Sequence, residues 1–276
     1  LSYYYPGMEN NLINQVKLLN VVILAGGKGK RMKSDLPKVL HTVDAKSMLS
    51  IVITKALNIR HPNIKVHVVM GEFQEQICQD LSKWGLLNKI NVIIQKEALG
   101  TGHAVQCCYN DLINTSRNNS HNSVLILFGD MPNISQDLLD TMVATHFKLN
   151  QNLLGILELK NPFGYGRIIK SNKNSLVAIV EEKDANEEQK KIKLVNTGLF
   201  LLNFNELKEH LFKLDNNNKQ NEYYLTDIVQ IFRQNNITIH PFNIRDPNEI
   251  VNVNTPEQLQ KVRKLYMDAI KDMVLH

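Results

Sequence analysis

The chain has 276 residues, of which 43% are hydrophobic and 21% charged, and its formal net charge is +5. That length and apolar content are enough for one large α/β domain with a sizeable core, and they exclude an intrinsically disordered chain. The lysines and arginines form no long run, so the modest positive charge favours small phosphate-bearing ligands over nucleic acid.

Several features bear on the cellular compartment. No apolar run approaches the length of a membrane span, and the first residues lack the basic and apolar regions of a signal peptide. Cys78, Cys107 and Cys108 have no metal-ligand spacing and are predicted to be reduced thiols. We therefore expect a cytoplasmic protein without membrane association. Residues 1–17 are expected to be an N-terminal extension or a vector-derived remnant, with Met8 as a candidate natural start.

Strands and helices are expected to alternate through the first half of the chain. Apolar runs predict strands at 18–24, 64–70, 90–94 and 124–128. Apolar residues at helical spacing and capping signals predict helices at 47–59, near 73–81, from about Thr101 and after Ser135. This alternation is typical of an α/β fold with a Rossmann-like, doubly wound and mostly parallel sheet, whose ligands bind beyond the carboxyl ends of the strands.

The pattern becomes mixed from about residue 154. Short strands are predicted at 154–159, 166–170, 176–181 and 197–203. Helices are predicted at 206–214 and from Pro256 to about Val274, with an exposed loop at 216–221. We expect this half, about 151–276, to fold over the sheet of the first half, about 18–150. Residues 18–276 are thus expected to form a single domain.

The sharpest motif directly follows the first predicted strand. It reads Leu24-Ala25-Gly26-Gly27-Lys28-Gly29-Lys30-Arg31-Met32, with Leu36-Pro37-Lys38 shortly after. Closely spaced glycines let backbone N–H groups approach an anion, and the basic side chains supply charge for a polyphosphate. The string lacks the third glycine of a dinucleotide fingerprint and the closing GK[ST] of a P-loop. On the glycines alone, a mobile turn with solvated lysines explains it equally well.

Two further motifs lie at the ends of predicted strands. Gln95 and the string Leu99-Gly100-Thr101-Gly102-His103-Ala104 form a strand end, a glycine turn and a helix start. Asp130 follows the 124–128 strand, where a carboxylate is well placed to hold Mg²⁺. In isolation, an ordinary connection or turn explains each segment as well. His103 is expected to pack or hydrogen-bond locally rather than to act as a general base.

Together these strings resemble the sugar-nucleotide pyrophosphorylases, and in particular the uridyltransferase domain of bacterial bifunctional N-acetylglucosamine-1-phosphate uridyltransferases. The resemblance covers roughly residues 21–260, with segments in the same order. Those of the second half are PFGYGRI at 162–168, VEEKDA at 180–185, VNTG at 195–198, EYYLTD at 222–227 and VNVNTP at 251–256. It implies a nucleotide-diphospho-sugar transferase fold of the GT-A-like type, with a nucleotide-binding first half and a sugar-binding second half.

The resemblance also implies the roles of individual residues. Arg31 and Lys38 would be catalytic contacts to the phosphates, and Asp130 and Asn254 would be the ligands of Mg²⁺. The implied nucleotide-binding residues are Leu24, Ala25, Gly26, Gly27, Gln95, Gly100 and Thr101. The implied sugar-binding residues are Phe128, Gly129, Gly166, Glu181, Asn196 and Tyr224. The chain departs from the family at Phe128, where Tyr is frequent, and at Lys30, where Thr is common.

The implied reaction joins UTP and N-acetylglucosamine 1-phosphate into a UDP-sugar, with release of pyrophosphate after in-line attack on the α-phosphate. Another sugar 1-phosphate, or dTTP in place of UTP, stays open. So does a catalytically silent regulatory homologue, although intact Arg31, Lys38, Asp130 and Asn254 argue against it. The bacterial enzymes continue into a left-handed β-helix that this sequence lacks, so acetyltransferase activity and obligatory trimerisation are not expected. Monomer and homodimer both remain open.

Overall fold

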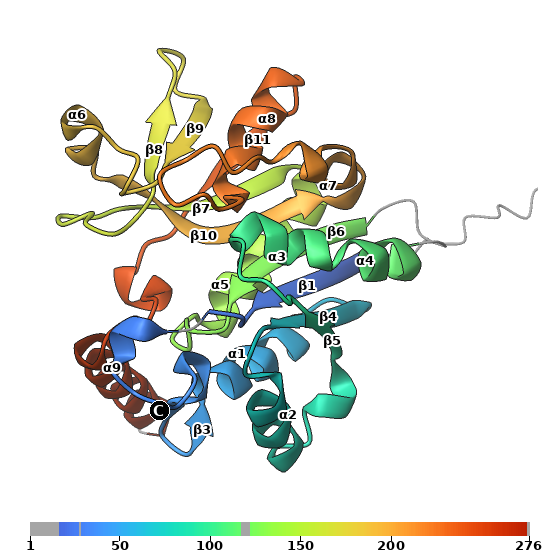
Figure 1. Cartoon of the computed structure of the whole chain (residues 1–276), viewed down its shortest axis with the longest axis vertical. Coiled ribbons are helices and arrows are strands. Elements are labelled where there is room, and N and C mark those ends of the chain that lie inside the picture. The colour runs from blue at the N-terminus through green and yellow to red at the C-terminus, as the bar shows by residue number, and fades with distance from the viewer. Residues whose placement is uncertain (1–16, 28, 117–121, 275–276) are drawn as a thin grey trace, which may run out of the picture.

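A single sheet of nine strands runs through the part of the chain that the computed structural model describes, residues 17–27, 29–116 and 122–274 (Figure 1). Its order along the main path is β11-β7-β10-β6-β1-β4-β5. Nearly all of the expected N-terminal extension and the loop residue Lys28 lie outside the described residues.

The centre of the sheet is made by parallel strands of the first half. β1 (Leu18–Leu24) lies between β4 (Ile64–Met70) and β6 (Asn122–Phe128), parallel to both, and β5 (Asn91–Ile94) adds a further parallel strand at the edge. β1 is buried along its whole length, as its uninterrupted apolar sequence predicts. The four strands expected here are confirmed to within two residues at each end.

Strands of the second half extend the same sheet. β10 (Leu194–Asn203) is antiparallel both to β6 and to β7 (Asn152–Glu158), and β11 (Ile239–Asn243) lies parallel to β7 at the other edge. β8 (Arg167–Lys170) and β9 (Leu176–Val180) form a hairpin that branches from β10. The predicted strands are present, and β11 is an additional one.

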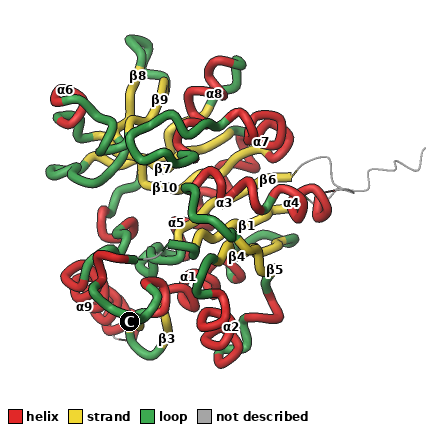
Figure 2. The backbone as a smooth tube through the Cα atoms, in the orientation of Figure 1, coloured by secondary structure: helices red, strands yellow, loops and turns green. Residues whose placement is uncertain are grey.

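Helices cover both faces of the sheet (Figures 1 and 2). One face packs against α1 (Met48–Leu57), α2 (Gln74–Lys83) and α5 (Gln136–Leu149). The other packs against α3 (Thr101–Cys107), α4 (Tyr109–Ser116), α7 (Phe204–His210) and α8 (Ile228–Gln234). Alternate residues of β1 point into the two hydrophobic cores. Val21 packs on one side of the sheet and Val22 on the other. The expected doubly wound, mostly parallel architecture is therefore confirmed.

Shorter elements surround the carboxyl ends of the central strands. After β1 come the 3₁₀ turns Lys30–Met32 and Lys38–Leu40 and the small hairpin of β2 (Thr42–Val43) and β3 (Lys46–Ser47). α6 (Glu187–Lys190) follows β9, and α9 (Pro256–Val274) packs its first turns against Met32, Val43 and Met48. In the described part of the chain, no helix combines the length and the apolar character needed to cross a membrane.

Candidate active site

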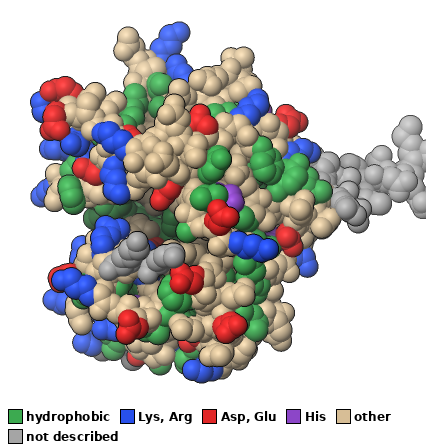
Figure 3. All heavy atoms as spheres, viewed as in Figure 1, with side chains coloured by type: hydrophobic (Ala, Val, Ile, Leu, Met, Phe, Trp, Pro, Cys, Tyr) green, Lys and Arg blue, Asp and Glu red, His purple; other side chains and the backbone are tan. Residues whose placement is uncertain are grey.

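A cavity of about 510 Å³ lies where the parallel strands end. It is lined by residues that follow β1, β5 and β6, among them Ala25, Gln95 and Asp130. The space-filling view shows a hollow on this face, between the half that carries β8 and β9 and the half that carries α9 (Figure 3). This is the position at which a doubly wound sheet binds its ligands.

The glycine-rich turn after β1 leaves its backbone accessible at the cavity. A Cβ on Gly27 would meet no atom within 4 Å, so the backbone there faces open space. Gly29 has φ +61°, and a Cβ at that position would lie 2.6 Å from Lys38 Cβ. Only glycine therefore lets the turn fold back closely enough to bring Lys38 to the cavity wall.

Lys38 lies at the centre of a small cluster of polar side chains. Its ammonium forms an ion pair with Asp130 Oδ2 and donates to Asn254 Oδ1 at 3.1 Å. The other carboxylate oxygen of Asp130 accepts from Asn252 Nδ2 at 3.0 Å. Asn254 is fixed through its backbone N–H, which donates to Gln258 Oε1 at 2.7 Å. Two side-chain oxygens thus converge on one positive charge at the end of β6.

This pair of oxygens fits a magnesium site. Mg²⁺ prefers oxygen ligands, and it commonly takes only one or two from the protein and the remainder from water and substrate phosphates. Asp130 and Asn254 supply one carboxylate and one amide oxygen, and both already face a cation, the Lys38 ammonium. These are the two residues that the resemblance implied as metal ligands, and that role stays a prediction.

The opposite wall of the larger cavity is built on the start of α3. Gly100 has φ +112°, and a Cβ there would lie 2.6 Å from Tyr223 O. The segment is pinned further, because Tyr223 N donates to Leu99 O at 2.8 Å and Gly102 N donates to Tyr223 O at 2.7 Å. Gln95 points its amide nitrogen at Gly100 O, 3.1 Å away. The second half of the chain thus holds the strand-to-helix turn of the first.

A second cavity of about 190 Å³ adjoins the first. Thr101 and Phe128 line both cavities. The Phe128 ring lies against Gly198, where φ is +82° and a Cβ would lie 2.5 Å from Phe128 Cε2. Asn252 lines the smaller cavity and donates to Asp130, which lines the larger one. The Lys38 cluster therefore lies at the junction of the two spaces.

The wall of the smaller cavity carries a half-buried carboxyl group, that of Glu181. Glu181 accepts from Thr226 Oγ1 at 2.9 Å, and both its carboxylate oxygens would lie 3.5 Å from a Cβ on Gly166. Burial raises the pKa of Glu181, and the nearby charges of Asp184 and Glu222 add to that effect. Asn196 Oδ1 accepts from Gly198 N at 2.9 Å. A carboxyl and an amide beside a glycine backbone suit a ligand rich in hydroxyl groups.

Acidic groups surround this wall on the side of residues 215–227. Tyr224 is buried and donates through its hydroxyl to Asp184 Oδ2 at 3.1 Å. Burial, together with this hydrogen bond and neighbouring charges, raises the pKa of Tyr224 to about 12. Burial and the charges of Asp215, Glu181 and Asp184 raise the pKa of Asp227 to about 6. Several carboxyl groups that raise one another's pKa therefore lie close together behind the smaller cavity.

Most residues singled out in the sequence lie together at this junction, but not all of them line a cavity. Arg31 is exposed in the 3₁₀ turn after the glycines, and Gly129 packs against Leu24 and Leu49. Tyr224 lies behind the smaller cavity and contacts Asp184. The remaining implied residues line one of the cavities, except Asn254, which reaches it through Lys38.

Several polar residues that line the two cavities were missed in the sequence, among them Asn252 and Thr226. Asn252 donates to Asp130, and Thr226 donates to Glu181. A signal existed for Asn252, because it lies two residues before Asn254 in an extended segment, where side chains i and i+2 share a face. Thr226 sits within the EYYLTD string and was passed over in favour of Tyr224.

Comparison with known proteins is consistent with this geometry. The family model described as Nucleotidyl transferase matches residues 20–244. A probable UDP-N-acetylglucosamine pyrophosphorylase of Acanthamoeba polyphaga mimivirus is 38% identical over 251 residues, which cover 90% of this chain and 96% of the viral protein. The bifunctional protein GlmU of Marinobacter nauticus is 40% identical over 248 residues, and that of Streptococcus uberis is 40% identical over 235. The chain spans 52% and 48% of these two bacterial proteins.

Solved structures share the fold at much lower sequence identity. A UDP-glucose pyrophosphorylase complexed with UDP-glucose superposes with a TM-score of 0.71 at 16% identity, covering 91% of this chain and 99% of that one. A putative glucose-1-phosphate thymidylyltransferase from Bacillus anthracis gives a TM-score of 0.70 at 17% identity, with 90% and 94% coverage. These likenesses concern the fold, over about nine tenths of the chain.

Proposed function

The chain belongs to the nucleotidyl transferase family, and from that premise we propose that it transfers the uridylyl group of UTP to N-acetylglucosamine 1-phosphate. The observation that carries the proposal is the junction of two cavities at Lys38, Asp130 and Asn254. The larger cavity has room for a nucleotide and the smaller one for a sugar. Their shared wall at Thr101 and Phe128 would bring the phosphates of both ligands to the same polar cluster.

In this proposal an oxygen of the sugar 1-phosphate attacks the α-phosphorus of UTP, the bond to the bridging β-phosphate oxygen breaks, and pyrophosphate leaves. No general base is required, because a phosphate monoester is already ionised near neutral pH. When bound at Asp130 and Asn254, Mg²⁺ would neutralise charge on the phosphate groups and reduce their mutual repulsion.

The residues of the chain then act mainly by positioning and charge. The Lys38 ammonium would turn from Asp130 and Asn254 to the phosphate oxygens, while the backbone at Gly26 and Gly27 approaches the polyphosphate. Gln95 would contact the base from the opposite wall. Arg31, which is exposed beside the turn, would reach the leaving pyrophosphate.

The sugar would be held in the smaller cavity by its hydroxyl and acetamido groups. Glu181 would accept from sugar hydroxyls, and the backbone of Gly166 lies against it with no side chain between. Asn196 and Gly198 line the cavity beside Phe128, whose ring lies against Gly198, and we propose that the N-acetyl group packs there. Phe128 offers a ring face without a hydroxyl, so the contact at that point is apolar.

The names of the relatives support N-acetylglucosamine 1-phosphate over other sugars. The viral protein matched along 96% of its length is named a probable UDP-N-acetylglucosamine pyrophosphorylase. The two solved structures carry names that refer to glucose, and their identity to this chain is 16% and 17%. Glucose, galactose or glucosamine 1-phosphate, and dTTP in place of UTP, are therefore the alternatives to test. The proposal keeps the reaction in the cytoplasm, where the free thiols of Cys78, Cys107 and Cys108 would stay reduced.

The test measures pyrophosphate release from UTP with each of these four sugar phosphates in turn, at saturating Mg²⁺. We expect N-acetylglucosamine 1-phosphate to give the highest kcat/KM. The rate with dTTP in place of UTP is measured at the same concentration of sugar phosphate. Faster turnover of another sugar phosphate would change the substrate assignment. No turnover with any of them, from a folded protein that binds UTP, would instead favour a catalytically silent regulatory homologue.

A further inference from the structure

The side-chain amide of Gln95 is oriented by a backbone carbonyl of fixed polarity. Gln95 Nε2 lies 3.1 Å from Gly100 O, and a carbonyl oxygen can only accept a hydrogen bond. Gly100 is the N-cap of α3, and its carbonyl also accepts the first helical hydrogen bond, from Ala104 N at 3.1 Å. The N-terminus of α3 therefore fixes the orientation of the Gln95 amide, with the nitrogen and not the oxygen toward Gly100.

The amide nitrogen of Gln95 also contacts His103, which lies in the first turn of α3. Its Nδ1 lies 3.0 Å from Gln95 Nε2, which is a donor, so Nδ1 must accept and the imidazole proton must reside on Nε2. Nε2 faces the sulfur of Cys107 at 3.8 Å, one helical turn further along. The neutral Nε2–H tautomer of His103 is thus the form that matches both of its neighbours.

The amide oxygen of Gln95 is left on the cavity side. A Cβ on Gly26, itself a cavity residue, would lie 3.1 Å from Gln95 Oε1. Gln95 is 6% exposed, and within the described part of the chain no hydrogen-bond donor approaches this oxygen. This oxygen therefore has a free acceptor position at the cavity, and a ligand that brings an N–H group there gains a hydrogen bond.

We propose that His103 is a positioning residue for base selection: it locks the Gln95 amide with its oxygen toward the cavity, which selects a base that carries a ring N–H. The inference rests on the proposed function, since it concerns the base of the nucleotide substrate. Uracil and thymine carry a hydrogen at ring position N3, whereas cytosine has a lone pair there. Cytosine would therefore bring an acceptor to Gln95 Oε1, and neither acceptor would be satisfied.

Accommodating cytosine requires the Gln95 amide to turn over. The oxygen would then face Gly100 O, which can only accept, and His103 Nδ1, which could donate only if the imidazole proton left Nε2 and its contact with Cys107 Sγ. His103 thus contributes one of the two interactions that oppose the flip. His103→Leu removes it, whereas His103→Asn keeps an acceptor, its Oδ1, near the position of Nδ1.

The experiment measures dissociation constants of UTP and CTP by calorimetry, and kcat/KM for both, in wild type, His103→Leu and His103→Asn. Wild type is expected to prefer UTP to CTP by at least about 10²-fold. His103→Leu should reduce that ratio on the order of tenfold, the value of one hydrogen bond, while His103→Asn should restore most of it. A purely structural role would weaken both nucleotides equally and leave the ratio unchanged.

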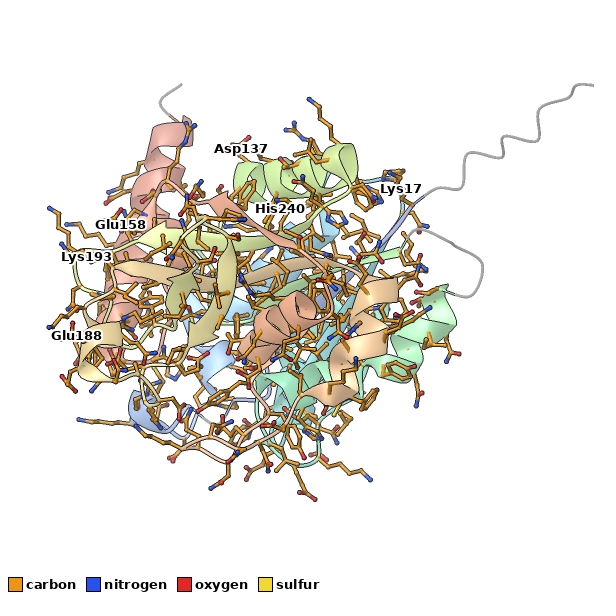
Figure 4. All side chains as sticks on the ribbon, turned by 90° about the horizontal axis from the view of Figure 1, so that it is seen from above. Lys17, Asp137, Glu158, Glu188, Lys193 and His240 are labelled. Carbon is orange, nitrogen blue, oxygen red and sulfur yellow. The ribbon has the colours of Figure 1, made fainter. Side chains whose placement is uncertain are left out.

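The control makes the same chemical change at His240, which Figure 4 labels on β11 and which lines neither cavity. His240→Leu should leave the ratio at the wild-type value. A folded His103→Leu protein with the wild-type ratio would overturn the inference. Failure of turnover with every nucleotide would count against the proposed function alone, because the binding ratio still decides the role of His103.

A second measurement uses only the wild-type protein, so it does not require any variant to fold. In ¹⁵N-histidine spectra of the wild-type protein with UTP bound, His103 should show a protonated Nε2 and an unprotonated Nδ1. A proton on Nδ1 would contradict the orientation of Gln95 from which the inference follows.

Discussion

The ammonium of Lys38 and the carboxylate of Asp130, which are 92 residues apart in the sequence, form an ion pair at the end of β6. Their side chains are only 14% and 7% exposed, so little water screens the interaction. Asn254 adds a further oxygen from the second half of the chain. Three distant segments of the chain are therefore brought together in one cluster of charged and polar side chains.

Lys38→Ala should lower kcat/KM for UTP by about 10²–10³-fold, because it removes a positive charge aimed at the reacting phosphates. Initial rates at varied UTP measure the effect. Lys148→Ala is the matched control: Lys148 is exposed on α5 and lines neither cavity, and the variant should keep the wild-type rate. A Lys38→Ala enzyme within about fivefold of wild type would remove Lys38 from the catalytic machinery.

Asp130→Asn should weaken binding of Mn²⁺, used as a spectroscopic substitute for Mg²⁺, by at least about tenfold, because the site loses its only carboxylate. Electron paramagnetic resonance measures free Mn²⁺ directly and needs no turnover. Lys38→Gln should have the opposite effect in the absence of nucleotide, since it removes the competing internal cation.

The control for the metal site is Asp137→Asn, a change of the same type on the exposed first turn of α5 (Figure 4). It should leave Mn²⁺ affinity unchanged. Equal Mn²⁺ affinity in Asp130→Asn and Asp137→Asn would show that the metal binds elsewhere.

Gly198→Ala should lower the free energy of unfolding by about 3 kcal/mol, from backbone strain at φ +82° and from overpacking against Phe128. Urea unfolding measures the loss. Gly85→Ala provides the comparison, because Gly85 also has a positive φ, +63°, but no atom lies near its Cβ position; about 1 kcal/mol is expected.

The overpacking part of this effect can be isolated with a double mutant. In a Phe128→Ala background, Gly198→Ala should cost only about 1–2 kcal/mol, since the ring that the new methyl group meets is gone. Strictly additive costs would mean that Phe128 does not lie against Gly198.

Asp227→Asn should stabilise the protein at pH 7.5 and lose that advantage below about pH 4. The pKa of Asp227 is raised from 3.8 to about 6, so the folded state binds a proton that the unfolded chain releases, and stability falls as pH rises through this interval. The shift sets an upper limit of about 3 kcal/mol, and partial solvent exposure of the carboxyl reduces the expected gain to about 1 kcal/mol.

Urea unfolding of wild type and Asp227→Asn at pH 7.5 and pH 4 checks this sign. A variant less stable than wild type at pH 7.5 would contradict it, and so would a gain that grows on acidification.

The sequence predicted the central strands well, because their signals are local. The strands at 18–24 and 64–70 are apolar runs that stop at or just before a glycine, and both match β1 and β4 in full. Ser135 was expected to cap the helix that follows, and its side chain accepts from Leu138 N at 3.0 Å.

Where prediction failed, the local signal was weak or opposed to the structure. β11 was missed because it contains Pro241 and only its first residue, Ile239, is buried. The proline is tolerated at the sheet edge, where the missing N–H costs no ladder bond. The helix expected from Thr101 divides at Cys108 into α3 and α4. α8 was also missed, although Phe232 and Ile228 pack it firmly on the sheet.

For the candidate site, motifs pointed to residues but not to their contacts. Lys38 and Asp130 were both singled out, yet their ion pair depends on the order of strands in the sheet. Gly129 lies within a motif but turns toward Leu24, since a strand end exposes only alternate residues. The orientation of the Gln95 amide follows from helix N-cap geometry, which sequence patterns do not contain.

The most direct test of the central claim identifies the product formed from UTP and N-acetylglucosamine 1-phosphate by ³¹P NMR. We expect UDP-N-acetylglucosamine and pyrophosphate in equal amounts, formed only with a divalent metal and not by Asp130→Asn. UTP that is bound but remains unchanged, or a product formed at the same rate by Asp130→Asn, would contradict it.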